Sequence, residues 1–160
     1  MYELDGHALG WGFNASAVIK VDQLLTIKTQ AMYGHGIQNY VADAPTDVAL
    51  QSDDRDPSTP FRGRALPLIG YFAFAELNWS KHLRSSLGYS FEQVENTDLQ
   101  QSNAFRRGQY GLVNLRYYPT ANIQVGIEYQ YGRRDNYADG FHAIANKLQI
   151  SFKIDFLSHL

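Results

Sequence analysis

Apolar and polar residues alternate one by one along most of this 160-residue chain. A period of two places the two kinds of residue on opposite faces of a β-strand. The segment that shows this most clearly has five apolar residues, Leu148, Ile150, Phe152, Ile154 and Phe156, separated by Gln149, Ser151, Lys153 and Asp155. Comparable segments cover residues 6–21, 24–37, 66–79, 83–95, 107–118, 123–134 and 143–156. The pattern predicts an all-β chain of about seven antiparallel strands.

The connections between these segments alternate in length. Residues 22–23, 80–82 and 119–122 form short links, whereas residues 38–65, 96–106 and 133–142 form longer ones. Outer-membrane barrels show this asymmetry, with short periplasmic turns and longer extracellular loops. We therefore expect one up-and-down transmembrane β-barrel segment over residues 1–160, in which the long loop 38–65 is the natural candidate to fold into the channel.

Aromatic residues gather near both ends of the expected strands. Trp79, Tyr117 and Tyr118 lie beside short links, and Tyr33, Tyr40, Tyr71, Phe91 and Tyr131 lie nearer the long ones. Two aromatic girdles at the membrane interfaces would produce this arrangement. The alternative is that aromatic residues simply mark strand ends, as they do in many β-sheets.

Periodicity alone does not say which face meets lipid. A soluble barrel turns its apolar alternates inward, and a membrane barrel turns them outward. Glycines recur among the polar alternates, where they weaken a solvent-facing strand but leave room in a lumen: Gly10, Gly12, Gly88, Gly126 and Gly132. This favours the membrane barrel. A soluble or non-conducting barrel that binds an apolar ligand is the alternative.

Composition argues against several other classes of protein. The net charge of −2 gives no basic surface for a nucleic acid, and the absence of cysteine excludes disulfides and thiolate metal sites. The five histidines lack the close spacing of metal ligands: His7, His35, His82, His142 and His159. No nucleophile elbow or phosphate loop occurs. We expect no enzyme, no metal and no cofactor.

The start of the chain bears on its place in the cell. It has neither the basic nor the apolar region of a signal peptide, and no apolar run approaches the roughly 18 residues of a membrane helix. Seven strands that begin at the outer side cannot leave both ends of a barrel in the periplasm. We therefore expect the C-terminal fragment of a larger barrel of the bacterial outer membrane, with a signal peptide and N-terminal strands missing from this chain.

Several motifs resemble the DcaP-like family of trimeric outer-membrane porins. They are Gly6–Ala8, Met32–Tyr40, Asp43–Pro45, Asp47–Val48, Leu83–Ser90, Asn114–Pro119, Val125–Tyr129, Tyr131–Asn136 and Ala145–Ser151. The resemblance covers almost the whole chain. It implies the last strands of a homotrimeric barrel that contacts outer-membrane lipid and takes up small anionic solutes, such as dicarboxylates, by passive diffusion. The chain departs from the family at its end, where Leu157–Leu160 follow the closing aromatic residue.

Charged residues among the polar alternates are the candidates for contact with solute. We expect a lumen lined by Lys20, Lys28, Arg84, Arg116, Glu128, Lys147 and Lys153. A modest excess of cations there would favour anions, because a low-dielectric wall magnifies charge. Four further arginines lie near the outer mouth: Arg106, Arg107, Arg133 and Arg134. They could gather anions or form ion pairs within the loops.

Overall fold

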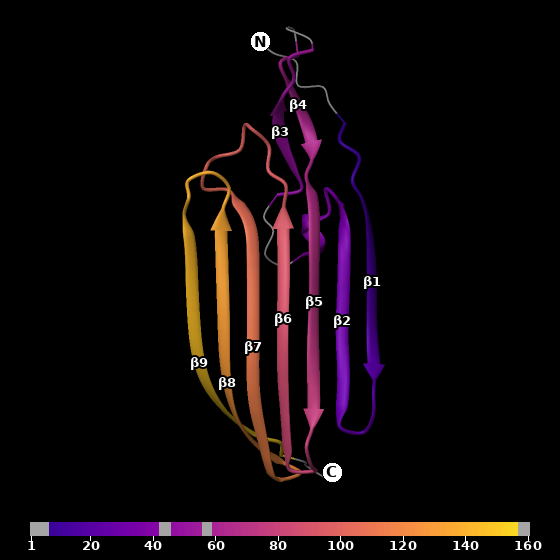
Figure 1. The fold of residues 1–160 in the computed structure, drawn as a ribbon, viewed down its shortest axis with the longest axis vertical. Helices are drawn as coiled ribbons and strands as arrows, with labels where there is room; N and C mark the ends of the chain where they lie inside the picture. Colours follow the sequence, from indigo (N-terminus) through magenta and orange to yellow (C-terminus); the bar gives the residue numbers. More distant parts are fainter. Residues whose placement is uncertain (1–6, 42–45, 56–58, 157–160) are drawn as a thin grey trace.

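A long antiparallel sheet of seven strands dominates the computed structural model, which describes residues 7–41, 46–55 and 59–156. Its strands follow the order β1-β2-β5-β6-β7-β8-β9 (Figure 1). Their bounds are β1 Trp11–Lys20, β2 Leu25–His35, β5 Pro67–Asn78, β6 Leu83–Val94, β7 Phe105–Thr120, β8 Ile123–Asn136 and β9 His142–Ile154. The tail Leu157–Leu160, the motif Asp43–Pro45 and the first residue of the motif Gly6–Ala8 lie outside the described residues. The seven strands of the sheet correspond to the seven predicted from the alternation.

Short links lie at one end of the sheet and long ones at the other, drawn at the bottom and the top of Figure 1. Side chains shape the short turns. The Asp22 carboxylate accepts hydrogen bonds from the backbone N–H groups of Leu24 and Leu25, at 2.8 and 2.7 Å. The Ser80 hydroxyl does the same for the next turn, at 3.1 Å from the nitrogens of both His82 and Leu83. We call these two ends the turn end and the loop end.

The segment predicted as one long loop, 38–65, carries structure of its own. It contains a short 3₁₀ helix, η1 (Gln38–Tyr40), and a separate hairpin of β3 (Val48–Ser52) and β4 (Phe61–Ala65). Figure 1 shows this hairpin standing above the loop end of the sheet. Each hairpin strand has only five residues, too few for the alternation to stand out from the surrounding polar sequence.

Cross-strand pairing sorts the side chains of the sheet into two faces. One row of directly paired residues runs Leu87, Val113, Tyr129 and Leu148, and the next runs Ser85, Leu115, Ile127 and Ile150. We call this side the apolar face and the opposite side, which bears the polar alternates, the polar face. Leu148 and Ile150 are 67% and 75% exposed, whereas Ser86 and Glu92 on the polar face are 7% and 9% exposed. This distribution is the reverse of that in a water-soluble sheet.

A small hydrophobic core lies on the polar face at the loop end. It consists of Leu66, Leu68, Val94 and Phe105, with Met32, Ile37, Val41 and Ala49 packed against it. Ile37, Val41 and Ala49 come from the segment around η1 and β3, so this core holds that segment against the sheet. The fully buried Gln38 adds a hydrogen bond from its Nε2 to the carbonyl oxygen of Leu66, at 3.1 Å. No helix in the described part of the chain has the length and apolarity to cross a membrane.

Candidate functional site

Two hollows lie along the polar face and show that the sheet curves toward this side. The hollow nearer the loop end has a volume of about 680 Å³, and Met32, Glu92 and Arg134 are among its lining residues. The segment that follows η1 borders it through Val41. The second hollow, of about 540 Å³, is lined mainly by polar-face residues from β1, β2, β5, β6 and β7. The polar face is therefore concave, a fact that alternation alone could not establish.

All seven residues predicted to line a lumen lie on the polar face. Their cross-strand partners are also polar-face residues: Lys20 pairs with Thr26, Lys28 with Phe74, Arg84 with Arg116, Glu128 with Asn114 and Gln149, Lys147 with Gln130, and Lys153 with Gln124. The structure thus brings these residues to one concave surface. Their contact with a solute stays a prediction.

Two arginines on this face stand directly opposite each other. Arg84 on β6 pairs with Arg116 on β7, and like charges in this position destabilise a sheet. Each guanidinium has a different partner. The Cζ of Arg84 lies 5.0 Å from the centre of the Tyr118 ring, and Nη2 of Arg116 donates to the Ser86 hydroxyl at 3.1 Å. Within the described residues, neither arginine forms an ion pair with a carboxylate.

Several other charged residues of the polar face have partners. Lys28 forms an ion pair with Glu76 across β2 and β5, at 2.8 Å. Lys153 lies 3.0 Å from Asp155. Glu128 accepts hydrogen bonds from Asn114, at 3.1 Å, and from Gln130. Lys20, Lys147 and Arg134 on this face also form no ion pair within the described residues. Arg84 and Arg116 differ from them because they stand directly opposite each other, in the turn-end half of the concave surface.

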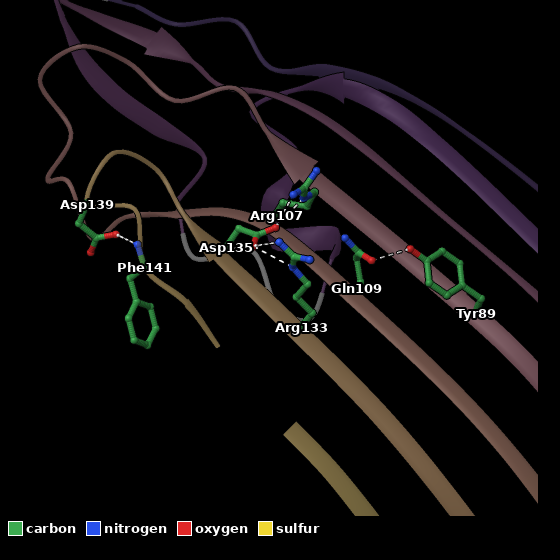
Figure 2. Close-up of polar contacts among 7 residues, drawn as sticks. All are labelled: Tyr89, Arg107, Gln109, Arg133, Asp135, Asp139 and Phe141. Atoms are coloured by element: carbon green, nitrogen blue, oxygen red, sulfur yellow. Dashed lines mark hydrogen bonds and ion pairs between the residues drawn. The ribbon is translucent and has the colours of Figure 1, made fainter. Parts of the chain in front are cut away.

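The four arginines predicted at the outer mouth all lie at the loop end but on different sides of the sheet. Arg134 is on the polar face, with its Cζ 5.7 Å from the centre of the Phe105 ring. Arg106 falls at a bulge where the register between β7 and β8 shifts. Arg107 and Arg133 project from the apolar face, where both bind Asp135 (Figure 2).

Sequence reasoning did not single out Asp135. The signal was present in part, because Arg133 and Asp135 are two residues apart on one strand and therefore share a face. Arg107 stands opposite Asp135 in the register that continues unbroken to Tyr117 and Val125, and this register differs from that of Thr120 and Ile123 beside the turn. Nothing in the sequence marks the shift between Tyr117 and Thr120.

Aromatic side chains mark both ends of the apolar face. At the loop end of β1 and β2, the Trp11 ring lies 5.9 Å from Tyr33 and stacks on His35 at 4.9 Å. Tyr71 and Phe91 stack at 5.3 Å between β5 and β6. At the turn end, the Trp79 indole N–H donates to the Ser85 hydroxyl at 2.9 Å. Aromatic rings therefore lie at two levels of this face, as predicted from the sequence. Their contact with lipid stays a prediction.

The described residues contain no group of three histidine or acidic side chains placed to hold a metal ion. The concave face itself presents hydrogen-bonding and charged side chains, such as Asn114, Arg116 and Glu76, along an open surface. Such a surface can guide a polar solute, and its unpaired arginines attract negative charge.

Comparison with known proteins relates the fold to a channel. No protein-family model matches the chain, and no curated protein matches it in sequence. Among solved structures, it matches the crystal structure of the outer membrane channel DcaP of Acinetobacter baumannii, with a TM-score of 0.77 and 23% sequence identity. The match covers 92% of this chain and 41% of the channel's chain. The resemblance predicted from the motifs is confirmed at the level of the fold: the chain folds as a β-sheet segment of that kind of barrel.

Proposed function

We propose that this sheet is part of the wall of a bacterial outer-membrane diffusion channel whose pore is lined by the polar face. The observation that carries the proposal is the inversion of the two faces, with apolar side chains on the outside and polar side chains on the concave side. A soluble barrel that binds an apolar ligand would need the opposite arrangement. Solutes would pass by diffusion, without a catalytic step.

Strand length supports a membrane-spanning role. The strands β5 and β6 each have 12 residues. At about 3.4 Å per residue and a tilt of about 40°, such a strand rises about 31 Å, which matches a hydrocarbon core of about 30 Å.

The edges of the sheet indicate that the channel contains further strands. Within the described residues, β1 pairs only with β2 and β9 only with β8. Unpaired backbone groups along these edges would be very costly in lipid, where only a closed barrel satisfies them. We propose that further strands of a longer protein close the barrel, and that three such barrels assemble as a trimer.

The charges of the pore wall support anions as solutes. Arg84 and Arg116 are neighbours without a paired carboxylate, and Nε of Arg116 is buried without a hydrogen-bond acceptor among the described residues. Two adjacent guanidinium groups can each bind one carboxylate of a small dicarboxylate. We therefore propose small hydrophilic anions of this type as the solutes.

Conductance of the full-length protein in a planar bilayer tests this function. With a salt gradient across the membrane, we expect stepwise conductance and a reversal potential that indicates a preference for anions. A dicarboxylate such as succinate should carry current or reduce the chloride current. Absence of conductance, or a clear preference for cations, would contradict the proposal. Recovery of a monodisperse protein without detergent would contradict the membrane assignment itself.

A further inference from the structure

Two arginines and one aspartate form a compact cluster on the apolar face at the loop end. One carboxylate oxygen of Asp135, Oδ2, contacts two nitrogens of Arg107, Nε at 2.7 Å and Nη2 at 2.6 Å. The other oxygen, Oδ1, contacts Nε and Nη2 of Arg133, both at 2.9 Å. Figure 2 shows the two guanidinium groups converging on the carboxylate. The Asp135 side chain is 12% exposed, whereas those of Arg107 and Arg133 are 37% and 34% exposed.

The cluster carries more positive charge and more donors than its own carboxylate can satisfy. Two guanidinium groups and one carboxylate leave a net charge of about +1. Each guanidinium has five N–H donors, and an ionised carboxylate accepts at about four positions. The four contacts to Asp135 therefore occupy the carboxylate and leave donors of both arginines for another acceptor. The single negative charge of Asp135 neutralises one of the two arginines and leaves the charge of the other without a counterpart in the cluster.

The rows beneath the cluster change from polar to apolar within a few residues. Arg133 lies in one row with Gln109, and the next row contains Tyr89, Gly111 and Tyr131. The Tyr89 hydroxyl donates to the Gln109 side-chain oxygen at 3.0 Å. A Cβ on Gly111 would meet no heavy atom closer than 3.7 Å, so the position between the two tyrosines has room for a further group. The following row is apolar, with Leu87 and Val113.

We infer that this cluster binds the phosphate headgroup of an outer-leaflet lipid, whose acyl chains lie along the apolar rows below. The inference rests on the proposed membrane location of the apolar face. Charge complementarity selects the headgroup, because a phosphate monoester carries one to two negative charges and three acceptor oxygens. Planar guanidinium groups bind such oxygens in pairs. Below the cations, Gly111 presents no side chain and the next row is apolar, so a polar group and an apolar chain meet suitable surfaces one after the other.

The test is lipid retention by the full-length protein extracted from membranes in dodecyl maltoside. Native mass spectrometry would compare phosphatidic acid, which has a phosphate monoester, with phosphatidylcholine, which does not. We expect the wild type to retain phosphatidic acid preferentially. The double variant Arg107→Gln/Arg133→Gln should bind it about tenfold more weakly, as expected when charge-assisted hydrogen bonds are lost. Lys81→Gln removes the same type of charge at the turn end and should bind as the wild type does.

A second variant guards against misfolding caused by an unpaired Asp135. Arg107→Gln/Arg133→Gln/Asp135→Asn neutralises the whole cluster, and gel mobility with and without heating would show whether the barrel folds. Equal retention of phosphatidic acid by this variant and the wild type would overturn the inference. Full displacement by millimolar inorganic phosphate would also overturn it, since the site would then bind the free anion. Loss of trimers with unchanged lipid binding would show instead that the cluster contacts a neighbouring subunit.

Conductance of the same preparations separates this inference from the proposed function. A wild type that retains phosphatidic acid through Arg107 and Arg133 but does not conduct would support the lipid site and contradict the channel. A wild type that conducts but shows no preference for phosphatidic acid would contradict the lipid site alone.

Discussion

The aromatic ring of Phe74 lies over Gly88, its direct partner across β5 and β6, on the polar face. A Cβ at Gly88 would overlap three carbon atoms of this ring. We expected glycines among the polar alternates to leave open space in a lumen. At this position the space is taken by an aromatic ring, which can come this close to the backbone because residue 88 has no side chain.

Replacement of Gly88 by alanine should force the Phe74 ring away from the wall. Overpacking of this kind typically costs about 1–3 kcal/mol, and we expect the free energy of unfolding of Gly88→Ala to fall by that amount. Gly132→Ala is the matched control, since a Cβ there would meet only a carbonyl oxygen at 4.0 Å. Urea unfolding of the protein in lipid vesicles, followed by tryptophan fluorescence, measures both. Equal stability of the two variants would show that the ring moves aside at no cost.

Arg84 and Arg116, adjacent on the proposed pore wall, should control ion selectivity. Replacement of Arg84 and Arg116 by glutamine removes two positive charges from one site, each worth about 1 kcal/mol toward an anion in a wet pore. We expect the ratio of anion to cation permeability to fall about fivefold or more. The reversal potential in a salt gradient reports this ratio. Lys81→Gln, in the turn Ser80–His82 outside the concave surface, is the control. A ratio unchanged in the double variant would exclude these arginines from the ion path.

Much of the sheet could be predicted from sequence because its determinants are local. Alternation reflects the two faces of a strand, and short polar links such as Asp22-Gln23 close hairpins between neighbours. These features need no knowledge of distant residues. The five-residue strands β3 and β4 were missed, because Val48 and Leu50 provide too short a pattern in a segment that otherwise reads as a loop.

Features that depend on the pairing of distant residues were not predictable. The side toward which the sheet curves is a property of all seven strands together. The meeting of Arg107 with Asp135 depends on the register between β7 and β8, which shifts between Tyr117 and Thr120 beside the turn. The sequence therefore predicted that Arg107 and Arg133 lie near the loop end, but not that they point away from the concave face.

Acid should loosen the hairpin of β3 and β4 from the sheet. Hydrogen bonds from Ser52 hold the pKa of Asp98 below its ordinary value of 3.8, and the Asp98 carboxylate accepts from the Ser52 N–H at 3.2 Å. A depressed pKa means that the stabilisation is present above the ordinary value and is lost as the pH falls through the lower folded value. The amide hydrogen-exchange rates of residues 48–52 are compared between the wild type and the Asp98→Asn variant at each pH. The ratio of the wild-type rate to the variant rate should change as the pH falls, because only the wild type loses a charged acceptor. A constant ratio between the two proteins would contradict this role.

A charge placed on either face of β9 distinguishes lipid from lumen most directly. Ile150 lies on the apolar face in a row with Ile127 and Leu115, whereas its neighbour Gln149 lies on the polar face opposite Glu128. If the apolar face meets lipid, Ile150→Arg should reduce the free energy of folding into vesicles by about 2–4 kcal/mol, as for an arginine near the bilayer midplane. Gln149→Arg introduces the same side chain one residue away and should leave stability nearly unchanged, because it faces water and a carboxylate. Folding yield and urea titration in vesicles measure the difference. If Gln149→Arg proved the more costly change, the polar face would be the one in contact with lipid, and it would not line a pore.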